Sequence, residues 1–394
     1  MRGTDSDVMQ RNGDTHSLCA FVLFIGINML FLIKYASRLS AHITAISAVA
    51  YIGLLIIFRI CYMRSKPYRY ADTAAVVLAL VYAVLSVLML TQVDKHSLNV
   101  DRWEIIDLFW RSVARGEYPY SAVAHNGNHI GAMPVYHILC LPFHCIGEIG
   151  YATLLSIAAM LIAIYRAPQK QGNSLLFATM LIISSPAILW ETLTRSTIIY
   201  NSALFYLFML YLRRFETFSK TQFIITAIIG GALASTRTTL ALIYVIWGIY
   251  MLRQHIPFKR LLAWTGICIA SYVVTFLPLI IAYPSQFLEI NPFTVQSGVT
   301  NNAELAAFVA LMILTGFLPK NHKSLIFYIG TYLFVIIGIN FVDRAAHYSL
   351  RGALMESSMD ISYFLFSLPF LLHSAVLPYR HETGKTPIGQ QNYN

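Results

Sequence analysis

The sequence predicts an all-α protein, a polytopic transmembrane helical bundle with about twelve spans. Two observations lead to this prediction. Hydrophobic residues make up 57% of the 394 residues and charged residues only 12%, whereas a soluble domain is about 25% charged. The apolar residues also gather in repeated runs, close to the roughly 20 residues that a helix needs to cross a bilayer. We therefore expect residues 1–394 to form a single integral membrane domain.

Three apolar runs precede the longest polar segment of the chain, at about 17–35, 42–62 and 72–93. Nine follow it, at about 150–166, 174–191, 196–213, 221–236, 238–252, 261–283, 303–319, 324–342 and 360–378. The stretch 133–147 is apolar but short, and Pro134 and Pro142 interrupt it. We expect a re-entrant segment there, with both ends on the same side. Irregular backbone at membrane depth must be covered by protein or line a water-filled cavity.

The lysines and arginines predict the orientation of the spans, because cytoplasmic loops of membrane proteins carry an excess of them. With the N-terminus placed in the cytoplasm, 18 of the 28 lysines and arginines fall on inside segments. A full span at 133–147 would invert every later loop and remove most of this bias. We therefore predict an inner-membrane or plasma-membrane protein with both termini in the cytoplasm, including a C-terminal tail at 379–394.

Composition also argues against two kinds of partner. The orientation rule accounts for the net charge of +10, and no basic run alternates with stacking aromatic residues, so nucleic acid is not expected. Four histidines crowd the polar segment without the spacing of a metalloprotease motif: His125, His129, His137 and His144. No metal site is predicted, and no cofactor is required.

The longest polar segment, 94–149, falls outside in this topology as an extracytoplasmic loop. Its stretch DRWEIIDLFWRSVARG predicts an amphipathic helix at the membrane interface. Asp101 can cap the first N–H groups of that helix, and Gly116 can end it. Apolar residues recur at helical spacing: Ile105, Leu108, Phe109 and Val113. Long loops of this kind tend to carry function.

Charged residues of the outside segments are the candidates for a site. Asp101, Glu104 and Asp107 recur at three-residue steps along the helix, a spacing that also fits a solvated acidic face. Five outside arginines are not explained by topology: Arg102, Arg195, Arg237, Arg344 and Arg351. Positive charge placed against the orientation rule indicates a local anion, such as an acidic side chain, a lipid headgroup or a bound phosphate. The alternative for each is a snorkelling side chain or a structural ion pair.

Three segments resemble GT-C membrane glycosyltransferases, which use sugars linked to polyprenyl phosphate. In the polar loop, an acidic residue follows an early span, and an interfacial helix, GEYPY and the proline-led MPVYHILCLPFHCIGEIG come after it. SPAILWETLTRSTIIYN resembles a later proline-containing helix end, and GGALASTRTTLALIYVIWG a helix break around an arginine. The layout of roughly residues 75–250 is most similar to the branch of polyprenyl-phosphomannose-dependent mannosyltransferases.

The chain also departs from the family pattern. It lacks the paired Asp-Glu signature of the protein O-mannosyltransferase branch. The polar loop has no Asp-x-Asp, so nothing in the sequence supports a divalent metal. Glu191 to Arg195 stand where the later motif usually has Gly-Gln.

The resemblance implies an inverting glycosyl transfer, which needs a base for the proton of the acceptor hydroxyl and positive charge on the departing phosphate. By resemblance Asp101 is the base, with Glu104 and Asp107 as further acidic candidates. Arginine suits the phosphate because its planar fork binds phosphate in a bidentate manner. The candidates for that role are Arg102, Arg237, Arg344 and Arg351.

The implied partners are a polyprenyl-phosphate sugar donor, a glycan or lipid-linked acceptor, and the membrane lipids. Six further side chains are candidates for contacts with the acceptor or the sugar: Tyr118, Tyr120, His125, His129, Glu191 and Arg195. Tyrosine rings can stack on sugars, although tyrosine is also ordinary at a membrane interface.

Two other classes of protein share some of these features. A transporter or flippase of lipid-linked glycans often has internal repeats and charges near the bilayer midplane, and this sequence shows neither. A polysaccharide polymerase or ligase that uses lipid diphosphates would also have external arginines, but its large loop usually falls late in the chain. Here the longest loop follows the third span.

Overall fold

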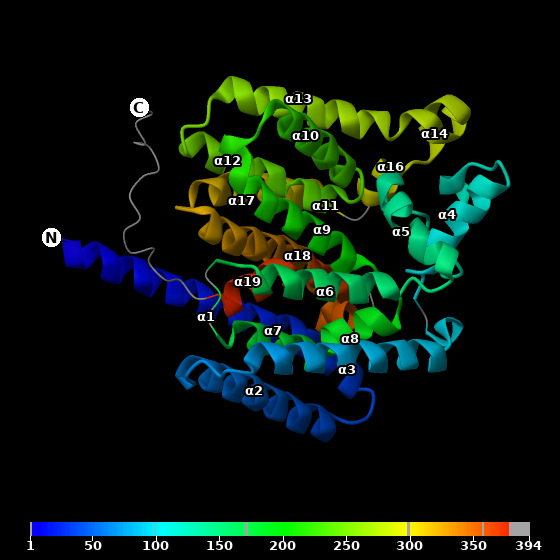
Figure 1. Cartoon of the computed structure of the whole chain (residues 1–394). Coiled ribbons are helices and arrows are strands. Elements are labelled where there is room, and N and C mark those ends of the chain that lie inside the picture. Colours follow the sequence, from blue (N-terminus) through cyan, green and yellow to red (C-terminus); the bar gives the residue numbers. More distant parts are fainter. Residues whose placement is uncertain are drawn as a thin grey trace, which may run out of the picture.

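The computed structural model describes residues 2–377 except 99, 169, 171, 298–299 and 357, and these residues form an all-helical fold (Figure 1). The tail expected at 379–394 lies outside the described residues. The fold class predicted from composition is therefore confirmed at the level of helices, and the bends between those helices are described below.

The bundle is built around α1 (Arg2–Ala36), which packs along the last helix, α19 (Leu368–Val376), and against α18 (His322–Leu354). The hydroxyl of Ser17 donates a hydrogen bond of 3.0 Å to the carbonyl of Ala375, across 358 residues of chain. The first and last helices therefore meet inside the molecule.

Two helices on the lower side of Figure 1 have the surface expected of lipid-facing spans: α2 (Ala41–Arg64) and α3 (Ala71–Gln92). The hydroxyl of Ser40 accepts a hydrogen bond from the N–H of Ile43 and so caps α2. Large apolar side chains of α2 are exposed: Ile46, Val49, Ile57 and Met63. An exposed apolar surface of this extent is typical of contact with lipid or another apolar partner.

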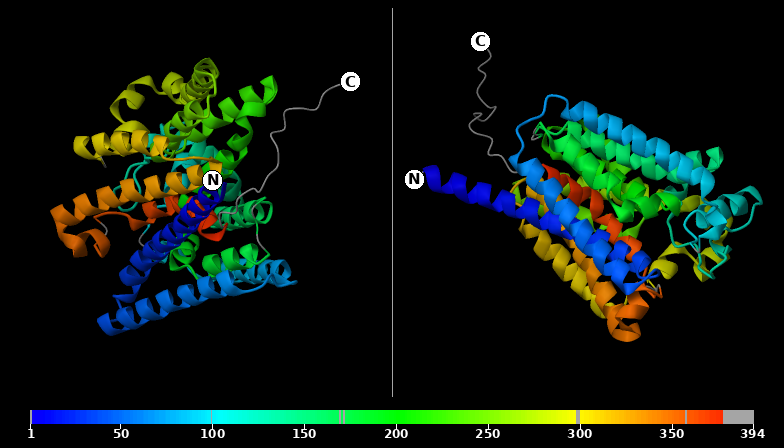
Figure 2. Two further views of the ribbon diagram at one scale, coloured as in Figure 1. Left: turned by 90° about the vertical axis from the view of Figure 1, so that its left-hand side faces the viewer. Right: turned by 90° about the horizontal axis from the view of Figure 1, so that it is seen from below.

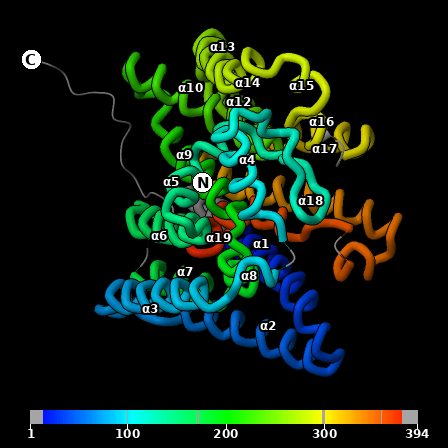
Figure 3. Tube along the Cα trace, turned by 90° about the vertical axis from the view of Figure 1, so that its right-hand side faces the viewer, coloured from blue at the N-terminus to red at the C-terminus, as the bar shows by residue number. Residues whose placement is uncertain are grey.

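The polar loop folds into short helices at one end of the bundle (Figures 1 and 3). They are η1 (Lys95–Ser97), α4 (Glu104–Ala114), η2 (Pro119–Ser121) and α5 (Pro134–Ile146). The helix expected at 101–116 is confirmed, but it begins at Glu104, and no side chain caps its first turn. Asp101 does not cap it because its carboxylate binds two asparagine amides instead. Gly116 ends it with a left-handed φ of 70°.

The apolar face of α4 packs inside the protein. Ile105, Ile106 and Phe109 are buried in a second hydrophobic cluster, together with Tyr136 and Cys140 of α5. Partly buried side chains from residues 279–290 complete it: Leu279, Tyr283, Phe287 and Ile290. Much of the apolar face of α4 thus packs inside the protein, and the location of this helix at the membrane interface stays a prediction.

The stretch 133–147 forms a helix, and the chain changes direction only after the end of that helix. Pro134 stands in the first turn of α5, where a proline breaks no hydrogen bond of the helix. After Gly147, with a left-handed φ of 88°, the chain turns into α6 (Tyr151–Tyr165). The two helices are bent by 113°, which fits a broken span or a re-entrant loop. The re-entrant topology stays a prediction.

Two further parts of the bundle are bent or tightly packed. α7 (Ser174–Ile183) and α8 (Pro186–Leu193) meet at 60°. α10 (Lys220–Ala234) and α13 (Phe258–Val274) approach closely at Gly231, where an added Cβ would lie 2.1 Å from the carbonyl oxygen of Cys268. Small residues of this kind let two helix backbones come together.

The remaining helices complete the upper and central parts of Figure 1. They are α9 (Ile198–Tyr211), η3 (Leu212–Thr217), α11 (Thr238–Ala241), α12 (Ile243–Arg253), α14 (Leu277–Ala282), α15 (Pro284–Glu289), α16 (Pro292–Ser297), α17 (Asn302–Phe317) and η4 (Ile361–Phe366). η4 follows α18 and packs against α9 and α18.

By length and composition, five helices of the described chain are able to cross a membrane, and seven spans result when each bent pair counts as one. These long apolar helices support a multi-pass membrane protein. All twelve expected runs fall on helices, but some helices are shorter than the roughly 20 residues of a span. α19, for example, has 9 residues, because the first half of its apolar run forms η4.

Candidate functional site

Arg102 is the centre of the candidate site, because three segments far apart in the chain meet at its guanidinium group. Nη1 donates a hydrogen bond of 2.8 Å to the hydroxyl of Ser196, in the link between α8 and α9. Nη2 forms an ion pair with the carboxylate of Asp360, just before η4. The Arg102 side chain is only 12% exposed, so it is fixed in the protein rather than extended toward the headgroups.

Arg237 comes to the same place from the break between α10 and α11. Its guanidinium lies 5.2 Å from the ring centre of Tyr136 and interacts electrostatically with the side chains of Tyr136 and Tyr363. The ring centre of Tyr363 also lies 5.9 Å from the guanidinium of Arg102. Tyr363 thus contacts both arginines, and two of the four predicted phosphate-binding arginines are brought together.

Asp101 adjoins this pair of arginines in a short loop. Its Oδ2 accepts hydrogen bonds from the side-chain amides of Asn128, over 2.8 Å, and Asn126, over 3.1 Å. Burial raises the pKa of this carboxyl, but the two amides and the charge of Arg102 outweigh burial, so the pKa of Asp101 lies below its usual value. Asp101 is therefore ionised at neutral pH, which is the form a general base requires.

Of the two other acidic candidates, Glu104 fastens the loop to α4, and Asp107 forms its ion pair within α4. Glu104 pairs with the imidazole of His125 and accepts the backbone N–H of the same residue over 3.2 Å. Asp107 pairs with Arg111 one turn further along the helix, over 2.8 Å, and lies 3.9 Å from Nδ1 of His144. The structure therefore joins the predicted residues Glu104 and His125 to each other.

Tyr118 and Tyr120 lie inside the protein. The hydroxyl of Tyr118 donates to the carbonyl of Ile290 over 2.7 Å, and that of Tyr120 donates to the carbonyl of Ala132 over 2.9 Å. Burial raises the pKa of Tyr118 to about 12. Both rings are buried, so a sugar would reach them only after the loop moved, whereas His129 is exposed.

Glu191 is a fully buried residue of α8, and its carboxylate reaches the start of α9. Its Oε1 accepts the N–H of Ile199 over 2.9 Å, and a carboxylate is favourable at the positive end of a helix dipole. The positive charge of Arg102 also acts on this carboxylate. Glu191 is therefore a buried carboxyl group near Arg102.

Arg195 has the structural role that the sequence left open as an alternative. Its Nη2 donates to the carbonyls of Leu90 and Val93 at the end of α3, over 2.7 and 2.8 Å. Its Nε lies 3.3 Å from the carboxylate of Glu148, and its side chain is 4% exposed. Arg195 thus ties the end of α3 to the link between α8 and α9.

Arg344 and Arg351 belong to the end of α18 that projects from the bundle (Figure 2). Arg351 is 84% exposed and lies 3.7 Å from Glu356. Ser349, between the two arginines, has a left-handed φ of 73°, which kinks the helix. The environment of Arg351 is therefore unlike that of Arg102.

Four side chains near the site were not predicted: Lys34, Tyr136, Asp360 and Tyr363. Lys34 is buried near the end of α1, where the charge of Arg102 acts on it. The sequence could have indicated Lys34, because the orientation rule that selected the arginines also places this lysine on an outside segment. Asp360 is an acidic residue at the edge of an apolar run, and the tyrosines had no signal beyond their type.

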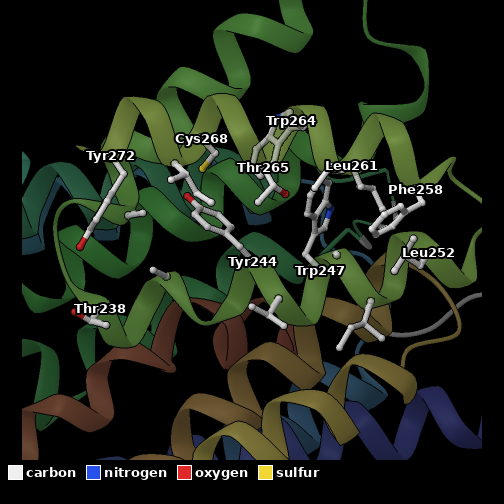
Figure 4. A pocket seen from close by; sticks show the side chains of 17 residues that line it. Thr238, Tyr244, Trp247, Leu252, Phe258, Leu261, Trp264, Thr265, Cys268 and Tyr272 are labelled. Atoms are coloured by element: carbon white, nitrogen blue, oxygen red, sulfur yellow. The ribbon is translucent and has the colours of Figure 1, made fainter. Parts of the chain in front are cut away.

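An apolar groove of about 530 Å³ lies between α10, α12 and α13 (Figure 4). Thr238 and Tyr272 stand at one end, and Leu252 and Phe258 at the other. Aromatic side chains line its middle: Tyr244, Trp247 and Trp264. Asp101 and the arginines are not among the lining residues, but Thr238 directly follows Arg237 in the chain.

Two arginines and a buried lysine lie close together here, with the carboxyl groups of Asp101, Asp360 and Glu191 beside them, and the guanidinium groups are suited to an anion. Among the residues that the structure describes, no group of three His, Cys, Asp or Glu side chains is placed to hold a metal ion. Comparisons with known protein families, with curated proteins and with solved structures give no match for this chain.

Proposed function

We propose that this protein is an inverting glycosyltransferase that moves a sugar from a polyprenyl-phosphate donor to a glycan or lipid-linked acceptor on the extracytoplasmic face. One observation carries the proposal. Arg102 and Arg237, from distant segments, both contact Tyr363, and the ionised Asp101 adjoins Arg102. Fixed guanidinium groups suit a phosphate, and a carboxylate suits the proton of an acceptor hydroxyl.

In the proposed reaction the oxygen of the acceptor hydroxyl attacks the anomeric carbon of the sugar, and Asp101 takes the hydroxyl proton. The bond between that carbon and the phosphate oxygen breaks, and the polyprenyl phosphate leaves with the bonding electrons. Arg102 and Arg237 stabilise the negative charge that gathers on the phosphate. A single displacement of this kind inverts the configuration at the anomeric carbon.

The apolar groove supports a lipid-linked donor. Its aromatic and aliphatic lining would gain roughly 25 cal/mol for each Å² of chain surface removed from water. Thr238, the residue that follows Arg237, lines one end of the groove, and a chain bound there with its phosphate at that end would lead toward this arginine. The proposal includes the predicted topology, with about twelve spans, both termini in the cytoplasm, and residues 94–149 outside.

The test is a transfer assay with a panel of polyprenyl-phosphate sugars, on purified protein in vesicles that contain lipid-linked acceptors. We expect Asp101→Asn to lower kcat by about 10²-fold or more, the usual contribution of a general base. Asp343→Asn, which removes a half-buried acid paired with His347 on α18, is the matched control and should keep wild-type turnover.

Two results would count against the proposal. Equal turnover by Asp101→Asn and the wild type would refute the role of Asp101 as the base. Transfer from lipid-diphosphate donors alone would favour the polymerase or ligase class instead.

A further inference from the structure

A carboxylate already occupies the anion-binding side of Arg102. Oδ2 of Asp360 pairs with Nη2 of Arg102, while Oδ1 of the same group accepts the N–H of Ser362 over 3.0 Å and so caps η4. The Asp360 side chain is 38% exposed, against 12% for Arg102. The acid is therefore the more solvent-accessible member of the pair.

We propose that Asp360 is a counter-anion of Arg102. It holds the guanidinium in position before the donor binds, and the phosphate of the donor then displaces it from Arg102. This inference rests on the proposed function. A phosphate and a carboxylate compete for the same N–H fork, and two anions at contact distance repel each other. Asp360 re-forms its ion pair with Arg102 as the lipid phosphate leaves, and this competition assists product release.

The second arginine is coupled to the same carboxylate through η4. The N–H of Tyr363 donates to the backbone carbonyl of Asp360 over 3.2 Å, and the side chain of Tyr363 contacts Arg102 and Arg237. A shift of Asp360 away from Arg102 therefore moves the start of η4 and, with it, the tyrosine that both arginines share. Asp360 is thus a positioning residue that acts through Arg102.

Asp360→Asn isolates the charge, because asparagine has nearly the same shape and caps helices as well as aspartate does. The probe is farnesyl phosphate, titrated calorimetrically into the full-length protein in detergent micelles. We expect the variant to bind it at least about tenfold more tightly, which corresponds to about 1.4 kcal/mol. In the transfer assay KM for the donor and kcat should fall together, because phosphate release slows. A merely structural role would raise KM or leave it unchanged.

The same segment offers a matched control. Glu356 lies 3.7 Å from Arg351 and is 67% exposed, so Glu356→Gln removes an acid from an arginine pair outside the site and should keep wild-type affinity. Farnesol, which lacks the phosphate, measures the contribution of the chain alone. If Asp360→Asn does not fold, Asp360→Ser repeats the measurement, because a serine hydroxyl also caps.

Two negative outcomes are distinguishable. If wild-type protein binds farnesyl phosphate better than farnesol, but a folded Asp360→Asn protein binds it equally well or more weakly, the counter-anion role is overturned and the proposed function stands. If wild-type protein binds farnesyl phosphate no better than farnesol, both the counter-anion role and the phosphate site of the proposed function are overturned.

Discussion

Arginine side chains that are alike in the sequence lie in different environments in the fold. Arg102 meets a carboxylate, a hydroxyl and an aromatic ring in a nearly buried place, whereas Arg351 pairs with Glu356 in the open. Water weakens an exposed ion pair far more than a buried one. The orientation rule selected both because it counts charges along the chain and contains no information about depth.

Asn128 is the residue through which the acidity of Asp101 can be tested. Asn128→Ala removes the shorter of the two amide hydrogen bonds to the carboxylate, so the pKa of Asp101, now below its usual value, should rise. The acidic limb of the pH profile of kcat/KM should then move to higher pH. Asn173→Ala, which removes an amide that binds Tyr68 and Lys66 instead, should leave the limb in place.

The pH dependence of the free energy of unfolding should shift in the same direction as the acidic limb, toward higher pH. Because the pKa of Asp101 is depressed in the folded state, its stabilising contribution is present above the unfolded pKa and is lost as the pH falls through the folded pKa. Asn128→Ala should therefore lose that contribution at a higher pH than the wild type. If the acidic limb of kcat/KM stays in place in Asn128→Ala, Asp101 is not the group whose protonation sets that limb.

Removal of the Arg195 side chain is expected to lower the stability of the protein rather than to act directly on catalysis. Arg195→Ala leaves Glu148 without its buried partner and two backbone carbonyls of α3 without a donor, a loss of about 3–5 kcal/mol. Arg111→Gln, which breaks an exposed pair with Asp107, should cost less than about 1 kcal/mol. Denaturant unfolding in detergent measures both, and similar losses for the two variants would contradict this assignment.

At the scale of helices, the positions of the elements could be predicted, and their bends only in part. The run 174–191 was expected to be one span, yet it contains a second helix start. Ser185 accepts the N–H of Ile188 over 3.1 Å, and Pro186 takes the first helical position, a combination typical of a helix beginning. Hydropathy does not register this signal because both sides of the break are apolar.

The closeness of α10 and α13 gives a prediction for the helix pair. Gly231→Val would place side-chain atoms against the backbone of Cys268 and should force the two helices apart, at a cost of about 1–3 kcal/mol. Gly266→Ala lies on α13 with nothing within 4 Å of its Cβ, so it should be neutral or slightly stabilising. Thermal unfolding in detergent compares them, and equal midpoints would refute the close contact.

For the whole molecule, the sequence predicted the residues of the polar loop better than their partners. Asp101 was selected through the resemblance, and Arg102 and Arg237 because each is a positive charge against the orientation rule. Asp360 and Tyr363 were not, because η4 reaches Arg102 only through the packing of α1, α9 and α18 around it. A span count from hydropathy runs also merges helices that the fold bends or shortens.

The meeting of α1 with α19 has a consequence for how the protein is made. At about 5–20 residues per second, the 358 residues between Ser17 and Ala375 take about 20–70 s to synthesise. During that time the polar groups that α19 will satisfy, including the hydroxyls of Ser17 and Tyr62, lack the partners that α19 supplies. The bundle therefore closes only after α19 has been made, and a chain that stops before α19 leaves these hydrogen bonds of Ser17 and Tyr62 unmade.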